Sequence, residues 1–171
     1  MQLKSLKDTQ KLSEIISKKI SGGDIIFLYG EIGVGKTTFA RCFINCLESK
    51  KKINNSDVLS PTFNIVYDYD IGEIKIQHYD LYRLKNYNDI AQLGIFETQN
   101  HHIKIIEWPE LINPKPKDRL DIMFKYSKKM NFREKANLYY KLKKLLDVKE
   151  MGKLFIVLFA QNKNSNFSIG F

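Results

Sequence analysis

The apolar residues near the N-terminus recur with the period of a helix. Residues 3–20 contain a set at positions i, i+3, i+4 and i+8, namely Leu12, Ile15, Ile16 and Ile20. This spacing predicts an amphipathic helix with one buried face. Thr9 could cap this helix or lie near its start. The Ser-Gly-Gly-Asp sequence at 21–24 then ends the helix and leads into the next element.

Beyond this point the pattern alternates between strands and helices. Five consecutive apolar residues at 25–29 predict a buried strand, and a second helical pattern follows it: Phe39, Ala40, Phe43, Ile44 and Leu47. The segments 65–69 and 74–79 predict an antiparallel hairpin that turns at 70–73. Further strands are predicted at 103–106 and 120–126, separated from the hairpin by a short helix and loop at 88–100.

These elements predict an α/β fold in which helices flank a mixed β-sheet. With 171 residues, of which 43% are hydrophobic, the chain can bury one good core, so we expect a single domain over 1–171. The pattern is weaker after 126. A helical pattern at 136–148 and an apolar run at 154–159 precede a polar end, 161–171, that we expect to fray.

A glycine-rich motif, Gly-x-x-x-x-Gly-Lys-Thr, joins the strand at 25–29 to the following helix. Its glycines let the backbone N–H groups turn toward a polyphosphate, Lys36 adds a positive charge, and Thr37 can offer its hydroxyl to Mg²⁺. Such a match can arise by chance, but here a buried strand precedes it and a helix follows. The sequence therefore predicts a P-loop that binds nucleotide phosphates.

Two acidic residues each follow a predicted strand. Asp80 ends the hairpin, where a carboxylate could bind a metal or orient water, although it could also cap the turn that follows. Glu107 follows the run at 103–106, as a Walker B carboxylate follows its strand, and could hold Mg²⁺. His78 has no partner at the spacing of metal ligands, so we interpret it as structural.

Other candidates have two interpretations. Ser60 and Thr62 flank Pro61 just before a strand, which is typical of a switch segment in a P-loop enzyme but also of an ordinary turn. Trp108 is either a core residue or an aromatic side chain next to the site.

Composition narrows the class of protein. No run of about 18 apolar residues is present, and the first residues lack the pattern of a secretory signal, so we expect a cytoplasmic protein without a membrane partner. Cys42 and Cys46 are expected to be reduced packing residues. The net charge of +9 favours polyanions such as RNA or an acidic protein, or reflects drift in genome composition.

Four segments together, 29–41, 60–63, 78–84 and 106–110, resemble in order and spacing the bacterial tRNA threonylcarbamoyladenosine biosynthesis family TsaE, also called YjeE. The Asp-Leu-Tyr-Arg-Leu and Glu-Trp-Pro sequences are distinctive. The likeness covers about residues 8–126, and we therefore assign the part of the domain at 1–126 to the family. The segment 127–171 departs from the family.

The resemblance implies a small ATPase that binds ATP and Mg²⁺ and supports turnover of the TsaB–TsaD complex in tRNA modification, reaching tRNA indirectly. It implies a nucleotide site formed by Thr9, Gly33, Val34, Gly35, Lys36, Thr37, Thr38, Thr62, Trp108 and Arg133. Thr37 and Glu107 would hold the metal, and Asp80 and Lys36 would act in hydrolysis.

Two other functions are compatible with parts of the sequence. A small-molecule kinase shares the P-loop but needs a lid that excludes water, often rich in arginine. This chain has four well-separated arginines, Arg41, Arg83, Arg119 and Arg133. A non-enzymatic RNA-binding module is suggested by charge alone and predicts binding that weakens steeply with salt.

Overall fold

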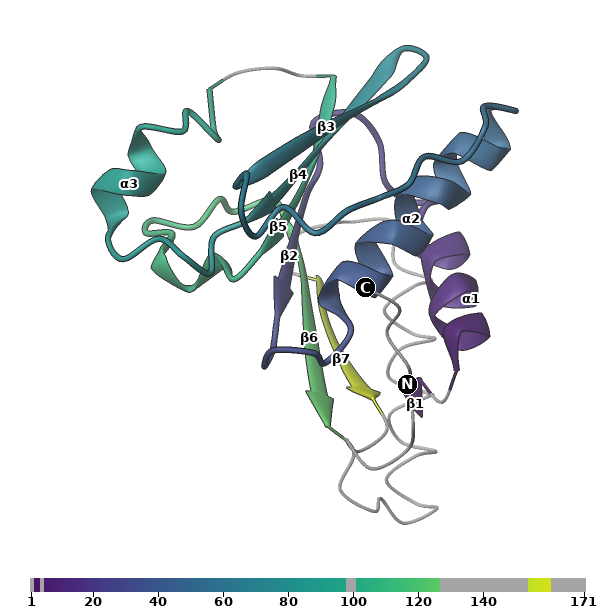
Figure 1. Ribbon diagram of the computed structural model, residues 1–171, viewed down its shortest axis with the longest axis horizontal. Helices are drawn as coiled ribbons and strands as arrows, with labels where there is room; N and C mark the ends of the chain where they lie inside the picture. The colour runs from purple at the N-terminus through teal and green to yellow at the C-terminus, as the bar shows by residue number, and fades with distance from the viewer. Residues whose placement is uncertain (1, 4, 98–100, 127–153, 161–171) are drawn as a thin grey trace.

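The computed structural model describes residues 2–3, 5–97, 101–126 and 154–160, which build one seven-stranded sheet with helices on both faces (Figure 1). The strand order is β1-β7-β6-β2-β5-β4-β3, and every pair is parallel except β3 with β4. The strands are β1 Gln2–Leu3, β2 Ile25–Tyr29, β3 Val66–Ile71, β4 Ile74–Asp80, β5 His102–Glu107, β6 Leu120–Tyr126 and β7 Leu154–Ala160. The predicted α/β class with a mixed sheet is confirmed.

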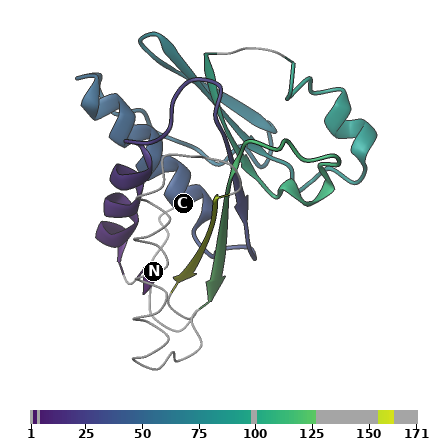
Figure 2. The same cartoon turned by 180° about the vertical axis from the view of Figure 1, so that it is seen from behind.

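Alternating side chains of the strands pack into two hydrophobic cores, one on each face of the sheet. Helices α1 (Leu6–Ile16) and α2 (Lys36–Lys50) cover one face, and the short helices α3 (Tyr87–Ala91) and η1 (Pro109–Leu111) lie on the other (Figures 1 and 2). Within β2, Ile26 and Leu28 belong to the core under α1 and α2, whereas Phe27 belongs to the opposite core. A strand buried on both faces explains why residues 25–29 read as a continuous apolar run.

The N-terminal helix is shorter than the predicted span of 3–20. Residues Gln2 and Leu3 form β1, which pairs with β7, and the helix then begins after Ser5. The Ser5 hydroxyl accepts a hydrogen bond from the Asp8 amide at 3.3 Å, so Ser5 is the N-cap. Of the two alternatives for Thr9, that it caps the helix is therefore wrong, and that it lies near the start of the helix is confirmed. Thr9 lies one turn into the helix and is buried.

The hairpin and the following helix agree with the sequence pattern in kind. β3 and β4 pair antiparallel from Val66↔Tyr79 to Ile71↔Ile74. Asn86 caps α3 by accepting from the Asp89 amide at 3.0 Å, and the helix ends at Ala91, as the predicted short helix and loop require. The apolar run at 154–159 forms β7. The predicted helix at 136–148 and the polar end at 161–171 lie outside the described residues.

Neither a membrane span nor a disulfide is found in the described part of the chain. None of the helices there has the length and apolar character that crossing a membrane requires. Cys42 and Cys46 both carry free thiols, as predicted.

Gly30, at the end of β2, provides a test of how tightly the loop is packed against the sheet. Its φ is +133°, and a Cβ there would lie 2.5 Å from the Phe124 carbonyl oxygen. Gly72 is the matched control, because its φ is +65° but a Cβ would meet no atom within 4 Å. We expect Gly72→Ala to lower the free energy of unfolding by about 1–2 kcal/mol, and Gly30→Ala to lower it by at least about 3 kcal/mol. Denaturant unfolding measures both; equal losses would contradict this packing.

Candidate functional site

The candidate site forms where the carboxyl ends of three neighbouring parallel strands meet. Glu107 at the end of β5 lies in register with Leu28 of β2 on one side and with Asp80 of β4 on the other. The pairing of β2 with β5 extends one residue further, because the Trp108 amide donates to the Leu28 carbonyl at 3.2 Å. Ligands of open α/β sheets bind at this edge. The two predicted acids therefore lie beside the glycine-rich loop.

The loop has the conformation that its glycines predict. Gly30, Gly33 and Gly35 all have positive φ, and the side chain of Val34 is buried in the core on the side of α1 and α2. Gly35 is the N-cap of the 15-residue helix α2 and supplies no side chain to the first amides of that helix. These amides, with the positive end of the helix dipole, are suited to bind an anion. Thr38, in the first turn of α2, is partly exposed.

Lys36 lies at the mouth of the loop and is only 4% exposed. Its ammonium donates to the carbonyl oxygens of Gly30 at 2.7 Å and Glu31 at 2.9 Å. Burial lowers the pKa of Lys36, while the nearby carboxylates of Glu107, Asp80 and Glu110 oppose this shift. The backbone and these acids hold the cation at the mouth of the loop.

Trp108 covers this cation. The Lys36 ammonium lies 3.8 Å from the centroid of the indole ring, a cation–π contact, and the centroid of the Tyr82 ring lies 4.9 Å from that of the indole. Trp108 is also partly buried against the core that contains Phe27 and Ile106. Both interpretations of the tryptophan thus apply in part, since one side chain belongs to the core and to the site.

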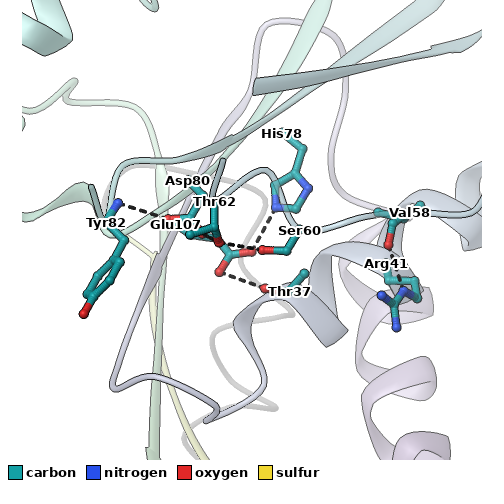
Figure 3. Close-up of polar contacts among 9 residues, drawn as sticks. All are labelled: Thr37, Arg41, Val58, Ser60, Thr62, His78, Asp80, Tyr82 and Glu107. Atoms are coloured by element: carbon teal, nitrogen blue, oxygen red, sulfur yellow. Dashed lines mark hydrogen bonds and ion pairs between the residues drawn. The ribbon is translucent and has the colours of Figure 1, made fainter. Parts of the chain in front are cut away.

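Glu107 is the centre of a buried polar chain (Figure 3). Its Oε2 accepts a hydrogen bond from the Thr37 hydroxyl at 3.1 Å, and its Oε1 lies 2.9 Å from the His78 Nε2. Glu107 is 2% exposed and His78 is fully buried. The two predicted metal ligands, Thr37 and Glu107, are therefore in direct contact.

Asp80 joins the segment around Thr62 to the same edge (Figure 3). The Thr62 hydroxyl donates to Asp80 Oδ2 at 2.6 Å and also lies 2.8 Å from the Ser60 hydroxyl. The other Asp80 oxygen, Oδ1, accepts from the Tyr82 amide at 3.0 Å. Asp80 therefore caps the following turn, as one interpretation predicted, and also binds the candidate switch. Thr62 contacts a carboxylate here, which an ordinary turn does not require.

The remaining predicted residues are not joined to this cluster. Among the described residues, no hydrogen bond or ion pair connects Thr9 to the loop, so its place near adenine stays a prediction. Arg133 lies outside the described residues. Arg41 of α2 donates from Nε to the Val58 carbonyl at 3.0 Å and so fixes the start of the candidate switch.

The contact of His78 with Glu107 is the feature of this site that sequence reasoning missed. The histidine lacked a partner at the spacing of metal ligands, but its partner, Glu107, comes from the neighbouring strand. One signal was available in the sequence. His78 and Asp80 are two residues apart on a strand and so face the same side.

The donor atoms at this edge suit a hard divalent cation. Thr37 and Glu107 offer a hydroxyl and a carboxylate in contact, and Asp80 follows on the next strand. Across the part of the chain that the structure describes, no group of three or more His, Cys, Asp or Glu residues could hold a metal by itself. Mg²⁺ is usually held by one or two protein groups together with the phosphates of a ligand, and Thr37 and Glu107 are groups of the kind it binds.

A glycine-rich loop between a buried strand and a helix, with acids at the ends of adjacent strands, defines a P-loop protein of the α/β class. Residues 3–135 match the family model described as threonylcarbamoyl adenosine biosynthesis protein TsaE. The chain belongs to this family, which acts in the biosynthesis of threonylcarbamoyladenosine in tRNA.

Curated relatives carry the same description, tRNA threonylcarbamoyladenosine biosynthesis protein TsaE. The protein of Rickettsia conorii is 38% identical over 110 residues, which cover 64% of this chain and 61% of the relative. The chain thus matches less than two thirds of that relative's length. The protein of Aquifex aeolicus is 37% identical, and the match covers 66% of this chain and 77% of the relative. The protein of Bacillus subtilis is 31% identical, and the match covers 70% of this chain and 72% of the relative.

A solved structure supports the fold. The crystal structure of Bacillus subtilis YdiB aligns with a TM-score of 0.55 at 23% identity and covers 82% of this chain and 90% of its own. At this identity the likeness concerns the arrangement of helices and strands.

The contact of Thr62 with Asp80 predicts that one hydroxyl orders the candidate switch. A hydrogen bond to a carboxylate contributes about 1.5–3 kcal/mol, and less at this partly exposed position. The Ile65 amide donates to the Pro61 carbonyl, and the Asp80 amide donates to the Ile65 carbonyl. We expect Thr62→Val to accelerate hydrogen exchange of these two amides about 5–30-fold. Thr62→Ser keeps the hydroxyl and should exchange like the wild type. Equal protection in both variants would contradict the role of this bond.

Proposed function

We propose that this protein is an ATPase subunit of the machinery that makes threonylcarbamoyladenosine in tRNA. The observation that carries the proposal is the direct contact of Thr37 with Glu107, in register with Asp80, at the mouth of the P-loop. Membership of the TsaE family supplies the pathway. The chemistry of the site supplies the reaction class, because positioning and electrostatic stabilisation are most of what phosphoryl transfer requires of a protein.

Nucleotide binding is assigned to the loop and its surroundings. The amides of residues 33–38 and the Lys36 ammonium would bind the phosphates, with Trp108 beside them and Thr62 in the switch. Thr37 and Glu107 would hold Mg²⁺, which supplies positive charge to the phosphate oxygens as charge develops. Contacts of the adenine with Thr9, and of the nucleotide with Arg133, belong to the same proposal.

Asp80 is assigned to hydrolysis. One of its oxygens is fixed by the Tyr82 amide, and the other accepts from the Thr62 hydroxyl. A carboxylate held in this way can orient a water molecule and accept its proton, while Lys36 offsets negative charge at the phosphates. A shift of the switch would change the contact of Asp80 with Thr62, so the switch could adjust hydrolysis.

The partners are proposed to be TsaB and TsaD homologues in the cytoplasm, with tRNA reached through that complex. Several large apolar side chains close to the loop in sequence or in space are exposed, among them Ile32 at 61% and Phe63 at 83%. Exposed apolar groups of this kind are suited to a protein interface. The net charge of +9 is compatible with an RNA-containing assembly.

The arginines favour an ATPase over a small-molecule kinase. Arg41 binds the Val58 carbonyl, Arg119 pairs with Asp121, and the Arg83 guanidinium lies 5.2 Å from the Phe63 ring centroid. In the described ranges of the chain, arginines thus support the fold and form no cluster that could serve as a lid.

Two pairs of variants test the assigned roles. We expect Lys36→Met to weaken ATP binding about 10–100-fold, because a charge-assisted contact with phosphate is lost.

We expect Asp80→Asn to keep Mg²⁺–ATP binding and to lower turnover about 10²–10⁴-fold, because the base is lost. Hydrolysis should be measured with and without TsaB and TsaD homologues.

The controls are of the same residue types. Lys104→Met removes a second buried lysine, on β5, and Asp68→Asn removes an exposed carboxylate that pairs with Lys75 on the hairpin. Both should bind and hydrolyse ATP like the wild type. If Lys36→Met and Asp80→Asn also do so, the assigned roles are wrong. Phosphate transfer to a nucleoside or sugar would instead favour the kinase.

A further inference from the structure

We propose that His78 is a positioning residue that orients Glu107 toward the magnesium site. The inference rests on the proposed ATP–Mg²⁺ function and adds a residue to it. His78 is fully buried, and its Nε2 lies 2.9 Å from Glu107 Oε1. It contacts a carboxylate assigned to the metal and would act only through it.

The contacts of Glu107 divide its two oxygens between two partners. Oε1 faces His78 on β4, whereas Oε2 faces the Thr37 hydroxyl at the start of α2 (Figure 3). A glutamate at the end of a strand can rotate about several bonds. The hydrogen bond from His78 to Oε1 fixes the orientation of the carboxylate. Oε2 then lies beside the Thr37 hydroxyl, where the metal site is proposed. Such outer partners commonly set the orientation of metal ligands.

The strand register explains why His78 can reach this carboxylate. In the β4–β5 pairing, Asp80 lies opposite Glu107 and His78 lies opposite Ile105. His78 is therefore one diagonal step from Glu107, on the face of the sheet that also carries Asp80. A single strand thus supplies the proposed hydrolytic carboxylate and the group that orients the metal-binding one.

The chemistry of the pair fixes the direction of the hydrogen bond. A carboxylate only accepts hydrogen bonds, so the imidazole donates from Nε2. Within the described residues, the buried Nδ1 has no hydrogen-bond partner. In the described part of the chain, the polar contact that this buried ring makes is the one to Glu107. For packing alone, an apolar side chain would fill this position without burying an unsatisfied nitrogen.

The test measures how much Mg²⁺ is needed for nucleotide binding. A ribose-labelled fluorescent ATP analogue is titrated into the full-length protein at a series of Mg²⁺ concentrations, and in EDTA. His78→Leu keeps an apolar side chain in the pocket without the donor, whereas His78→Gln places an amide N–H near the position of Nε2. We expect His78→Leu to raise the half-saturating Mg²⁺ concentration about 10–100-fold. His78→Gln should restore a value close to that of the wild type.

A double-mutant cycle shows whether the effect passes through Glu107. Glu107→Gln should itself raise the Mg²⁺ requirement, and adding His78→Leu to it should cause no further increase. Binding in EDTA should be the same for His78→Leu, His78→Gln and the wild type. A purely structural role would instead weaken binding with and without Mg²⁺, and the two substitutions would add.

Thermal unfolding of each variant separates misfolding from misorientation. If His78→Leu does not fold, His78→Asn takes its place, because its amide is too short to reach Glu107. His78→Asn should then need more Mg²⁺ than His78→Gln. An unchanged Mg²⁺ requirement in folded His78→Leu, or equal requirements for the asparagine and glutamine variants, would overturn the positioning role alone. A wild-type protein that binds no analogue at any Mg²⁺ concentration would overturn the proposed function as well.

Discussion

The parallel pairing of β2, β5 and β4 is the constraint from which the site follows. It places Leu28, Glu107 and Asp80 in one row across three strands, at the edge where the glycine-rich loop leaves the sheet. Successive side chains of a strand point to opposite faces, so a slip of one residue would turn Asp80 or Glu107 away from α2. The apolar residues of the two cores oppose that slip, because they would also change face. Burial of the core thus sets the positions of the acids.

The site buries several polar and charged side chains. Lys36, Asp80, Glu107 and His78 are each less than 5% exposed. Burying such groups is costly unless they are hydrogen-bonded, and here each has partners: loop carbonyls, a hydroxyl, a backbone amide or another side chain. Loss of one partner would leave another group unsatisfied. The stability of this edge and the geometry of its chemistry are therefore coupled.

Much of this arrangement could be predicted because the signals are local. The apolar run at 25–29, the hairpin and the acids that end two strands can be identified from neighbouring residues, and so can the glycine-rich loop. What was missed depends on contacts between distant residues. Pairing of Gln2 with Phe159 shortens the first helix and leaves Ser5 as its cap. The contact of His78 with Glu107 depends on the strand register, which no local pattern specifies. The assignments to nucleotide and metal stay predictions.

Trp108 has a consequence of a different kind. It is the only tryptophan in the sequence, and it adopts a left-handed backbone conformation with φ of +58° directly after Glu107. Its indole lies against the Lys36 ammonium and beside the Tyr82 ring. Indole emission responds to nearby charge and to the polarity of its surroundings. The protein therefore carries one intrinsic optical reporter, placed at the mouth of its loop, and events there can be followed by fluorescence without attaching a dye.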